Sequence, residues 1–178
     1  MTVDDINKLI RQFVRETLGM PANSVRKANQ TAPTGAQDEQ FATVLVTMIE
    51  PTGEDERKLA NEDAPSTNVA ETVTGQRRLV ASIQFFRGDA YTKACRLKTL
   101  MSLSGSIDKL QAIGLGFVRA SPVRNLTGLI DAGWEERGQI DLEFYLVAKE
   151  VQSIPTYGRF PIAVITEFST TSSEVIAP

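Results

Sequence analysis

Residues 139 to 148, with the sequence QIDLEFYLVA, alternate polar and apolar side chains more cleanly than any other stretch of the chain. Successive side chains of a β-strand point to opposite faces of a sheet, so this alternation predicts a strand with one face in the core and one face turned outward. Such a strand constrains the chain to a sheet that is covered on one side. The core-facing side chains are expected to be Ile140, Leu142, Phe144 and Leu146, and the outward ones Gln139, Asp141, Glu143 and Tyr145.

Residues 78 to 87, RLVASIQFFR, predict a second strand of the same kind. Its odd positions from Leu79 to Phe85 are apolar, and Ser82 and Gln84 lie on the opposite face. We therefore expect it to contribute to the same core.

Residues 41 to 50, FATVLVTMIE, predict a strand that is apolar on both faces. Such a strand is expected to be covered on two sides, either entirely by this chain or on one side by this chain and on the other by a partner. One face carries Leu45 and Ile49, and the other carries Val44, Val46 and Met48.

Two more strands are expected in the C-terminal half. Residues 115 to 133 predict a strand that is interrupted near Pro122 and followed by a turn-rich link. Because proline cannot donate a hydrogen bond to a ladder, this strand is expected at a sheet edge or to be bulged. Residues 160 to 168 predict a last strand, which carries Ile162 and Val164.

The sequence also predicts helices. Residues 3 to 18 carry an apolar stripe at three- and four-residue spacings, start after a capping Thr2 and end at Gly19. Residues 89 to 103 form a second helix with a core-facing stripe, and a short third helix is expected to start at a capping Ser106.

The order helix, strand, strand, helix, short helix, strand, strand, strand is typical of an α+β fold, a mostly antiparallel sheet with helices packed on one face. The 178 residues suffice for one domain that buries about 70% of the surface of its unfolded chain. We expect a single domain over residues 1 to 178, with long loops at 19 to 40 and 51 to 69 and a C-terminal arm at 169 to 178.

Several features of common catalytic sites are missing from the sequence. It has no histidine, which removes most acid–base and nucleophile–base arrangements, and its single cysteine excludes an internal disulfide framework or a cysteine-rich zinc site. That residue, Cys95, is expected to be a buried and unreactive thiol. Neither a phosphate-binding glycine loop nor a nucleophile elbow occurs. We therefore expect no enzymatic activity and no cofactor.

Acidic residues between Asp131 and Glu143 leave one alternative open. Together with Glu135 and Asp141 they could bind a hard divalent cation and serve a metal-dependent enzyme. The simpler interpretation places Asp141 and Glu143 on the outward face of their strand, where solvent or an arginine of a partner satisfies them. Arg137, two residues before that strand, is expected to pair with one of these acids.

The charge and hydropathy of the sequence indicate which partners and which cellular compartment to expect. Lys and Arg total 19 against 22 Asp and Glu, so the net charge of -3 provides no general attraction to nucleic acid. No apolar run reaches the ~20 residues of a membrane span, and the first residues carry charges where a signal peptide is apolar. We expect a protein that is made and kept in a cytoplasm.

Residues 133 to 144, GWEERGQIDLEF, start with a tight turn that leads directly into a strand. Trp134, the only tryptophan, lies in that turn. Its ring either covers the end of the core, which is the simpler interpretation, or anchors an interface. Both interpretations stay open at this point.

Long loops without catalytic residues, together with a strand that is apolar on both faces, favour a component of an assembly. Loops of this length in a compact domain are usually functional or disordered. Contact with other subunits is a use that requires no catalytic residue. The pattern does not say which assembly the chain joins.

Two stretches of the sequence resemble proteins of phage tails. Residues 82 to 97, SIQFFRGDAYTKACRL, and 126 to 146, LTGLIDAGWEERGQIDLEFYL, are similar to the neck or tail terminator proteins of contractile-tailed phages. The resemblance extends over roughly residues 40 to 150. It implies a subunit of a hexameric ring that stops the growth of the tail tube and sheath and joins the finished tail to the neck of the head.

The resemblance also implies partners and a location in the virion. The partners would be further copies of the chain, the tail tube and sheath proteins and a neck adaptor, with DNA as passing cargo in the lumen and no membrane. A different neck ring protein, such as a head–tail adaptor or stopper, is the alternative within the same class. Since a ring requires contacts between two different surfaces of each subunit, we expect interface residues. They are Trp134, Arg137, Asp141, Phe160, Ile162 and Val164.

Overall fold

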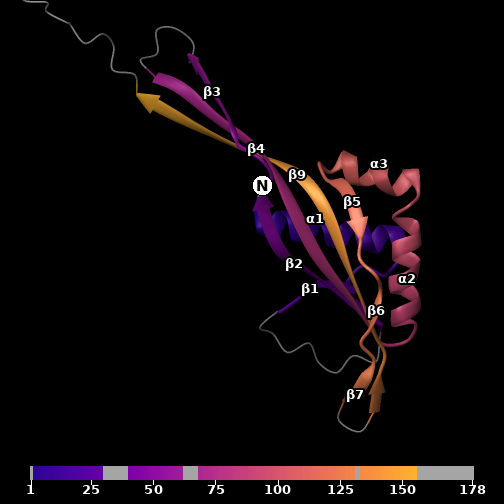
Figure 1. Cartoon of the computed structure of the whole chain (residues 1–178). Coiled ribbons are helices and arrows are strands. Elements are labelled where there is room, and N and C mark those ends of the chain that lie inside the picture. Colours follow the sequence, from indigo (N-terminus) through magenta and orange to yellow (C-terminus); the bar gives the residue numbers. More distant parts are fainter. Residues whose placement is uncertain (1, 30–39, 62–67, 131–132, 156–178) are drawn as a thin grey trace, which may run out of the picture.

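The computed structural model describes residues 2–29, 40–61, 68–130 and 133–155 (Figure 1). Within these residues the chain is a mostly antiparallel sheet with helices on one face, so the predicted α+β class is confirmed. The helices are α1 (Val3–Leu18), α2 (Ala90–Leu100) and α3 (Ser104–Ala112). The strands of the main sheet are β1 (Val25–Lys27), β2 (Phe41–Pro51), β3 (Glu56–Asn61), β4 (Asn68–Phe86), β5 (Gly116–Ala120), β6 (Arg124–Asn125) and β9 (Arg137–Pro155).

Two long strands, β4 and β9, form the centre of the main sheet. They pair with each other over the full 19 residues of each strand, and the order through the sheet is β1-β2-β4-β9-β5. β3 pairs with β4 beyond the end of β2, and β6 pairs with β9 below β5. Only β1 and β2 run parallel to each other; the other pairs of this sheet are antiparallel.

The core lies between one face of this sheet and the helices. In β4 and β9, every second side chain along the core points toward the helices and is buried, as the sequence pattern predicts. Ser82 and Gln84 lie on the opposite face of the sheet. Burying each large side chain of this kind contributes about 1.5–3 kcal/mol. The sheet residues of the core are Ala42, Val44, Leu79, Ala81, Ile83, Phe85, Ile140, Leu142 and Phe144, with Leu146 at its border.

Helix α1 starts and ends as predicted. The Thr2 hydroxyl accepts a hydrogen bond from the Asp5 backbone N–H at 3.2 Å, and the Asp5 carboxylate accepts one from the Thr2 N–H at 2.9 Å, which is a capping box. Gly19 ends the helix in the left-handed conformation, with φ of 64°. The buried stripe that holds α1 on the sheet is Ile6, Ile10, Phe13, Val14 and Leu18.

The predicted loop at 51 to 69 is wrong. β2 runs on to Pro51, β3 occupies Glu56–Asn61 and β4 already starts at Asn68. β3 has no buried face, because the side chains of Glu56 to Ala60 are exposed, so its sequence lacks the alternation that marks a strand over a core. The predicted loop at 19 to 40 contains the short strand β1, and its residues 30–39 lie outside the described part.

An arm therefore projects from the body of the subunit (Figure 1). We define the arm as β3, residues 68–76 of β4 and residues 147–155 of β9. The strand predicted at 78 to 87 starts ten residues earlier, and the one predicted at 139 to 148 runs seven residues further, to Pro155. Both predicted strands are too short for the same reason. Their segments in the arm are not covered by helices, so these segments lack the alternating pattern of a strand over a core.

Three smaller predictions also need correction. Helix α3 starts at Ser104 after Leu103, with no side-chain cap, and Ser106 is buried inside the helix. Helix α2 ends at Leu100, and Cys95 is half-buried in it rather than fully buried. The interruption near Pro122 is confirmed, since β5 is the terminal strand, has a shift of register between Phe117 and Arg119, and stops before the proline.

Candidate assembly interface

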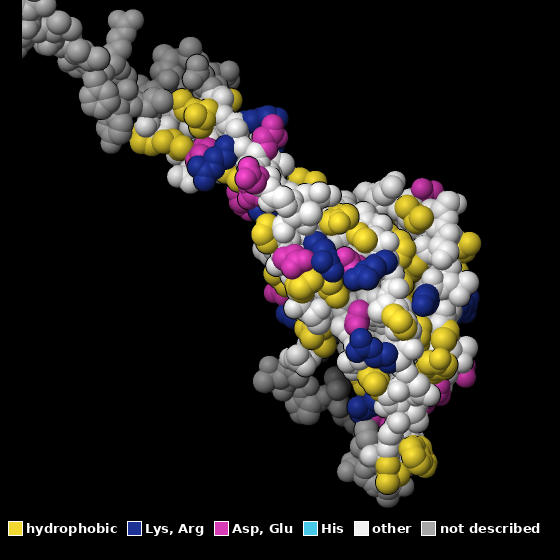
Figure 2. All heavy atoms as spheres, in the orientation of Figure 1, with side chains coloured by type: hydrophobic (Ala, Val, Ile, Leu, Met, Phe, Trp, Pro, Cys, Tyr) yellow, Lys and Arg dark blue, Asp and Glu magenta, His cyan; other side chains and the backbone are white. Residues whose placement is uncertain are grey.

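A second projection lies at the other end of β9. β7 (Gly128–Ile130) and β8 (Gly133–Glu135) form a small antiparallel hairpin directly before β9. Leu129 and Trp134 are cross-strand partners in it, and their side chains are 66% and 78% exposed. Figure 2 shows apolar side chains on this lower projection. The interpretation of Trp134 as a cover for the core is therefore wrong, because its ring is in solvent.

The base of the hairpin is fixed by the acids of the GWEERG motif. The Glu135 carboxylate accepts a hydrogen bond from Arg137 Nε at 2.7 Å and lies 3.4 Å from Arg87 Nε. Arg137 thus pairs with a neighbouring acid, as the sequence predicts. Since Glu135 has only 16% of its side chain exposed, this pair of arginines neutralises a largely desolvated carboxylate and holds the hairpin on the end of the sheet.

Glu136 joins the same base to helix α2. Its carboxylate accepts a hydrogen bond from the Tyr91 backbone N–H at 3.1 Å, and its carbonyl accepts one from the Arg87 N–H at 2.8 Å. The first turn of α2 contains no acid, and Asp89 makes no side-chain cap, so Glu136 supplies the negative charge that a helix N-terminus favours. The cap of this helix comes from a residue 45 positions further along the chain.

Gly138 allows this close approach. A Cβ atom at this position would lie 2.8 Å from the Ala90 carbonyl oxygen and 2.9 Å from Tyr91 Cα. Both distances are shorter than ordinary van der Waals contact, and both atoms belong to the backbone. The motif therefore ends with a glycine because β9 passes directly against the start of α2.

Aromatic rings and arginines form a column across the same end of the sheet. The rings of Phe41 and Phe86 are stacked with centroids 4.6 Å apart, and Arg26 and Arg137 lie over their outer faces at 5.5 Å and 5.2 Å. The column crosses β1, β2, β4 and β9 in order. Each contact contributes about 0.5–1.5 kcal/mol, so the column stiffens the end of the sheet from which the hairpin projects.

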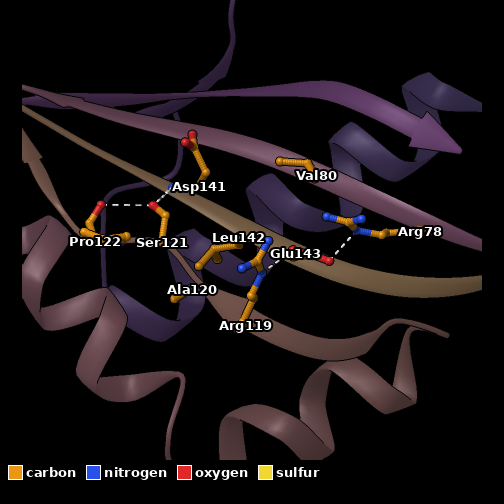
Figure 3. A pocket seen from close by; sticks show the side chains of 9 residues that line it. All are labelled: Arg78, Val80, Arg119, Ala120, Ser121, Pro122, Asp141, Leu142 and Glu143. Atoms are coloured by element: carbon orange, nitrogen blue, oxygen red, sulfur yellow. Dashed lines mark hydrogen bonds and ion pairs between the residues drawn. The ribbon is translucent and has the colours of Figure 1, made fainter.

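The open face of the sheet carries a buried carboxylate (Figure 3). Glu143 lies between Arg78 and Arg119, and Arg119 Nε donates to it at 2.5 Å. Arg119 and Arg78 lower the pKa of Glu143 despite its burial. The sequence places Glu143 on the outward face correctly, but solvent does not satisfy it, because the residue is only 8% exposed.

Asp141 lies beside this triad at the edge of a shallow hollow of about 280 Å³. Its carboxylate accepts a hydrogen bond from Gln139 Nε2 at 3.1 Å and lies 3.8 Å from Arg124. With Asp131 outside the described residues, no group of three acids or cysteines in the described ranges is arranged to hold a metal ion. The acids of the predicted cation site are instead bound to arginines where the structure describes them.

The arm exposes apolar side chains on both faces. Leu59, Val147 and Val151 are 70%, 66% and 61% exposed, and Figure 2 shows apolar patches along this projection. At the base of the arm, Arg77 donates to both oxygens of Asp55 at 2.6 Å and 2.7 Å, which lowers the pKa of Asp55. Exposed apolar groups on a projection, outside any core, are typical of surfaces that contact a partner.

Comparison with protein families identifies the chain. A family model described as phage neck terminator protein matches residues 4–173. The chain belongs to the phage neck terminator family. Membership makes it a structural protein of the phage neck, located in the tail and neck of the virion and in contact with other proteins there. No curated protein matches the sequence. Within the described ranges of this neck terminator family member, no helix is long and apolar enough to cross a membrane.

The residues predicted for the interface lie in different environments. Trp134 is exposed on the hairpin, whereas Arg137 and Asp141 make contacts within the chain. Phe160, Ile162 and Val164 lie outside the described residues. Sequence reasoning missed Leu129, Leu59, Val147 and Val151, although the last two give a signal, since they are apolar at outward positions of the alternating strand. The interface roles of all these residues in a neck terminator stay predictions.

Proposed function

We propose that the chain forms a ring, with six copies expected, that caps the tail tube and sheath and joins the finished tail to the neck. The observation that carries this proposal is the pair of apolar projections at the two ends of β9, the hairpin with Trp134 and the arm with Val151. In a chain of the neck terminator family, two different exposed surfaces are what a closed ring with partners above and below requires.

Ring geometry explains why the two projections differ. Each subunit of a ring contacts one neighbour with one surface and the other neighbour with a second surface. A capping ring must in addition present one end to the tail tube and the other end to the neck. We assign the hairpin and the arm to these contacts, within one domain that spans residues 1 to 178.

Charge supports a role beside DNA rather than on it. The chain carries a net charge of -3, and the buried Glu143 of the open face is paired with two arginines. A net negative charge gives the chain little overall electrostatic attraction to phosphates. DNA is therefore proposed as passing cargo in the lumen of the ring, and no catalytic role is assigned to the chain.

The test is the length distribution of tubes assembled from the tail tube protein of the same genome, measured by negative-stain electron microscopy with and without this chain. We expect tubes that stop growing and carry an extra ring at one end. Unchanged lengths without bound protein would contradict the capping role, and binding to the portal protein would then support a head–tail adaptor or stopper.

A matched pair of variants connects this assay to the hairpin. Trp134→Ala removes an exposed ring from the hairpin, so the monomer should stay within about 0.5 kcal/mol of the unmodified chain in stability, while capping is reduced. Leu103→Ala is the control, because its side chain is 54% exposed but lies between α2 and α3, away from both projections. Equal capping by both variants would remove Trp134 from the interface.

A further inference from the structure

The arm has an unpaired strand edge on each of its two sides. β9 pairs with β4 over its whole length, and on its other side with β6 and β5 only as far as Tyr145. Within the described ranges, β3 pairs with β4 alone, and no strand lies on the outer edge of β9 from Leu146 to Pro155. Each edge therefore presents backbone N–H and C=O groups to which another strand can be added.

Only a second copy of the chain can bring these two edges together. Within one subunit β4 lies between β3 and β9, so the two strands are separated by two inter-strand spacings, about 10 Å. In a ring, each copy contacts one neighbour with one surface and the other neighbour with a different surface. The outer edges of β3 and β9 are two such surfaces, on opposite sides of the same arm (Figure 1).

The direction of the strands fixes how the edges would meet. β3 and β9 run in the same direction, because each of them is antiparallel to β4. Rotation about a ring axis does not change the direction of a strand along that axis. The β3 strand of one copy would therefore lie parallel to the β9 strand of the next copy.

The charges of the two edges are complementary in this parallel arrangement. Along β9 the exposed Lys149 is followed by Glu150, and along β3 Glu56 is followed by Arg57. When Glu56 lies beside Lys149, Arg57 lies beside Glu150, so both pairs join opposite charges. A shift by one residue in either direction sets two like charges side by side, either Glu56 and Glu150 or Arg57 and Lys149. Because like charges on adjacent strands repel, the charges select one register.

Contacts within the subunit leave these side chains available. Glu56 lies 3.1 Å from Lys58, and Arg57 lies 3.8 Å from Glu71, with the Arg57 side chain 75% exposed. Ion pairs this exposed contribute little to stability, so they do not hold the side chains against a partner. The charges of β3 discourage pairing with an arbitrary strand and favour one that carries the complementary charges.

We propose that the outer edge of β3, Glu56–Asn61, pairs in parallel with residues 149–154 of β9 in the next copy of the ring. This inference rests on the proposed ring. Three strands from each of six copies would close into a sheet of eighteen strands, a number that leaves an open channel inside a β-barrel. The arms then form a wall around the lumen through which DNA is proposed to pass.

Charge reversal in separate full-length chains tests the pairing. Lys149→Glu sets a glutamate against Glu56, and Glu56→Lys sets a lysine against Lys149. Since the like pair is repeated at every interface, each variant alone should lose its rings in native mass spectrometry. Mixed in equal amounts, the two variants should form rings again, because in alternating order each interface joins opposite charges.

The matched control is Lys109→Glu, which makes the same change of charge on the exposed surface of α3 and should form rings alone. Rings from the unmodified chain without rescue in the mixture would overturn the pairing and leave the ring intact. This result is expected if another segment of the same chain or a strand of the tube protein occupies the β9 edge. Monomers of the unmodified chain, free and with tubes, would remove the ring and the pairing with it.

A disulfide tests the same register in a second way. In a Cys95→Ser background, one chain carries Ala60→Cys and Ser153→Cys, which lie side by side in the proposed pairing. Adjacent strands place Cα atoms about 4.8 Å apart, within the range of about 4.4–6.8 Å that a disulfide spans, whereas about 10 Å separates the two positions within one copy. We therefore expect covalent multimers up to the full ring.

Leu59→Cys with Ser153→Cys is the control, because Leu59 shares a row with Gln152 and its side chain points to the other face of the arm. This pair should stay at background. Intact rings of the Ala60→Cys and Ser153→Cys chain without covalent multimers would overturn the pairing.

Discussion

Replacing Gly138 by alanine should destabilise the subunit by about 2 kcal/mol. The new Cβ would lie 2.8 Å from a carbonyl oxygen of α2, so β9 and the helix must separate by about 0.6 Å to reach ordinary contact at 3.4 Å. Inserting one methyl group into a packed site typically costs about 1–3 kcal/mol, and the separation also lengthens the hydrogen bond from Tyr91 N–H to Glu136. In a domain of this size, that corresponds to a fall in Tm of roughly 4–8 °C.

Urea unfolding followed by far-ultraviolet circular dichroism measures this change, since the only tryptophan is exposed and reports poorly on the core. The matched control is Gly105→Ala in α3, where an added Cβ meets no atom within 4 Å. In a helix this substitution should stabilise by up to about 1 kcal/mol. If Gly138→Ala unfolds within about 0.5 kcal/mol of the unmodified chain, the close approach of β9 to α2 is not a constraint on this position.

Three further predictions follow from contacts within the subunit. Glu136→Ala should lower the free energy of unfolding by about 1 kcal/mol, because the Tyr91 N–H loses its acceptor. Glu136→Gln can still accept this hydrogen bond, so in the same urea assay its free energy of unfolding should stay close to that of the unmodified chain. Arg119 and Arg78 lower the pKa of Glu143, so the stability from this carboxylate is complete above its ordinary pKa of 4.5 and is lost as the pH falls through the lower value of the folded state. Glu143→Gln should therefore have a lower Tm than the unmodified chain at about pH 6, and this difference in Tm should become smaller toward about pH 3. A Tm difference that does not change with pH would show that the charged form of Glu143 does not stabilise the fold. Phe86→Leu should cost about 1–2 kcal/mol, since it removes both the stack on Phe41 and the cation–π contact with Arg137, and an unchanged urea midpoint would show that the column adds nothing beyond burial.

The core could be predicted from the sequence because burial leaves a pattern in it. Every second residue from Leu79 to Phe85 and from Ile140 to Leu146 is apolar, as required for a strand with one covered face, and all the residues at these alternate positions are buried. The same physics explains the error at the arm. Its strands have solvent on both sides, so nothing selects apolar residues at every second position, and Glu56 to Asn61 has the composition of a loop.

The hairpin base shows a different limit of sequence reasoning. Glu136 follows the exposed Trp134 in a turn-like stretch, and its partner is the backbone of Tyr91, 45 residues away. No local pattern connects them, because the contact exists only after β9 has packed against α2. The pairing of Arg137 is predictable from the sequence, because its partner Glu135 is two residues away in the chain.

For Glu143 the sequence predicts the correct face of the sheet but not its burial between two arginines of the same chain. Alternation decides which side of a sheet a residue faces, whereas its exposure depends on neighbouring strands. Arg78 comes from β4 and Arg119 from β5, and both side chains reach across the sheet to the same carboxylate. The sequence of β9 contains neither of these arginines, so it cannot predict the burial of Glu143.

β9 also has a mechanical consequence for the subunit. The hairpin is tied to its first residue, Arg137, and the arm ends at its last, Pro155, so one strand of about 60 Å connects the two projections without a turn. β4 is bonded to it along the whole length, and a pull along the arm therefore loads many hydrogen bonds in shear at once. Such a pair behaves as a stiff lever, and a displacement at the tip of the arm is transmitted to the base of the hairpin through the core.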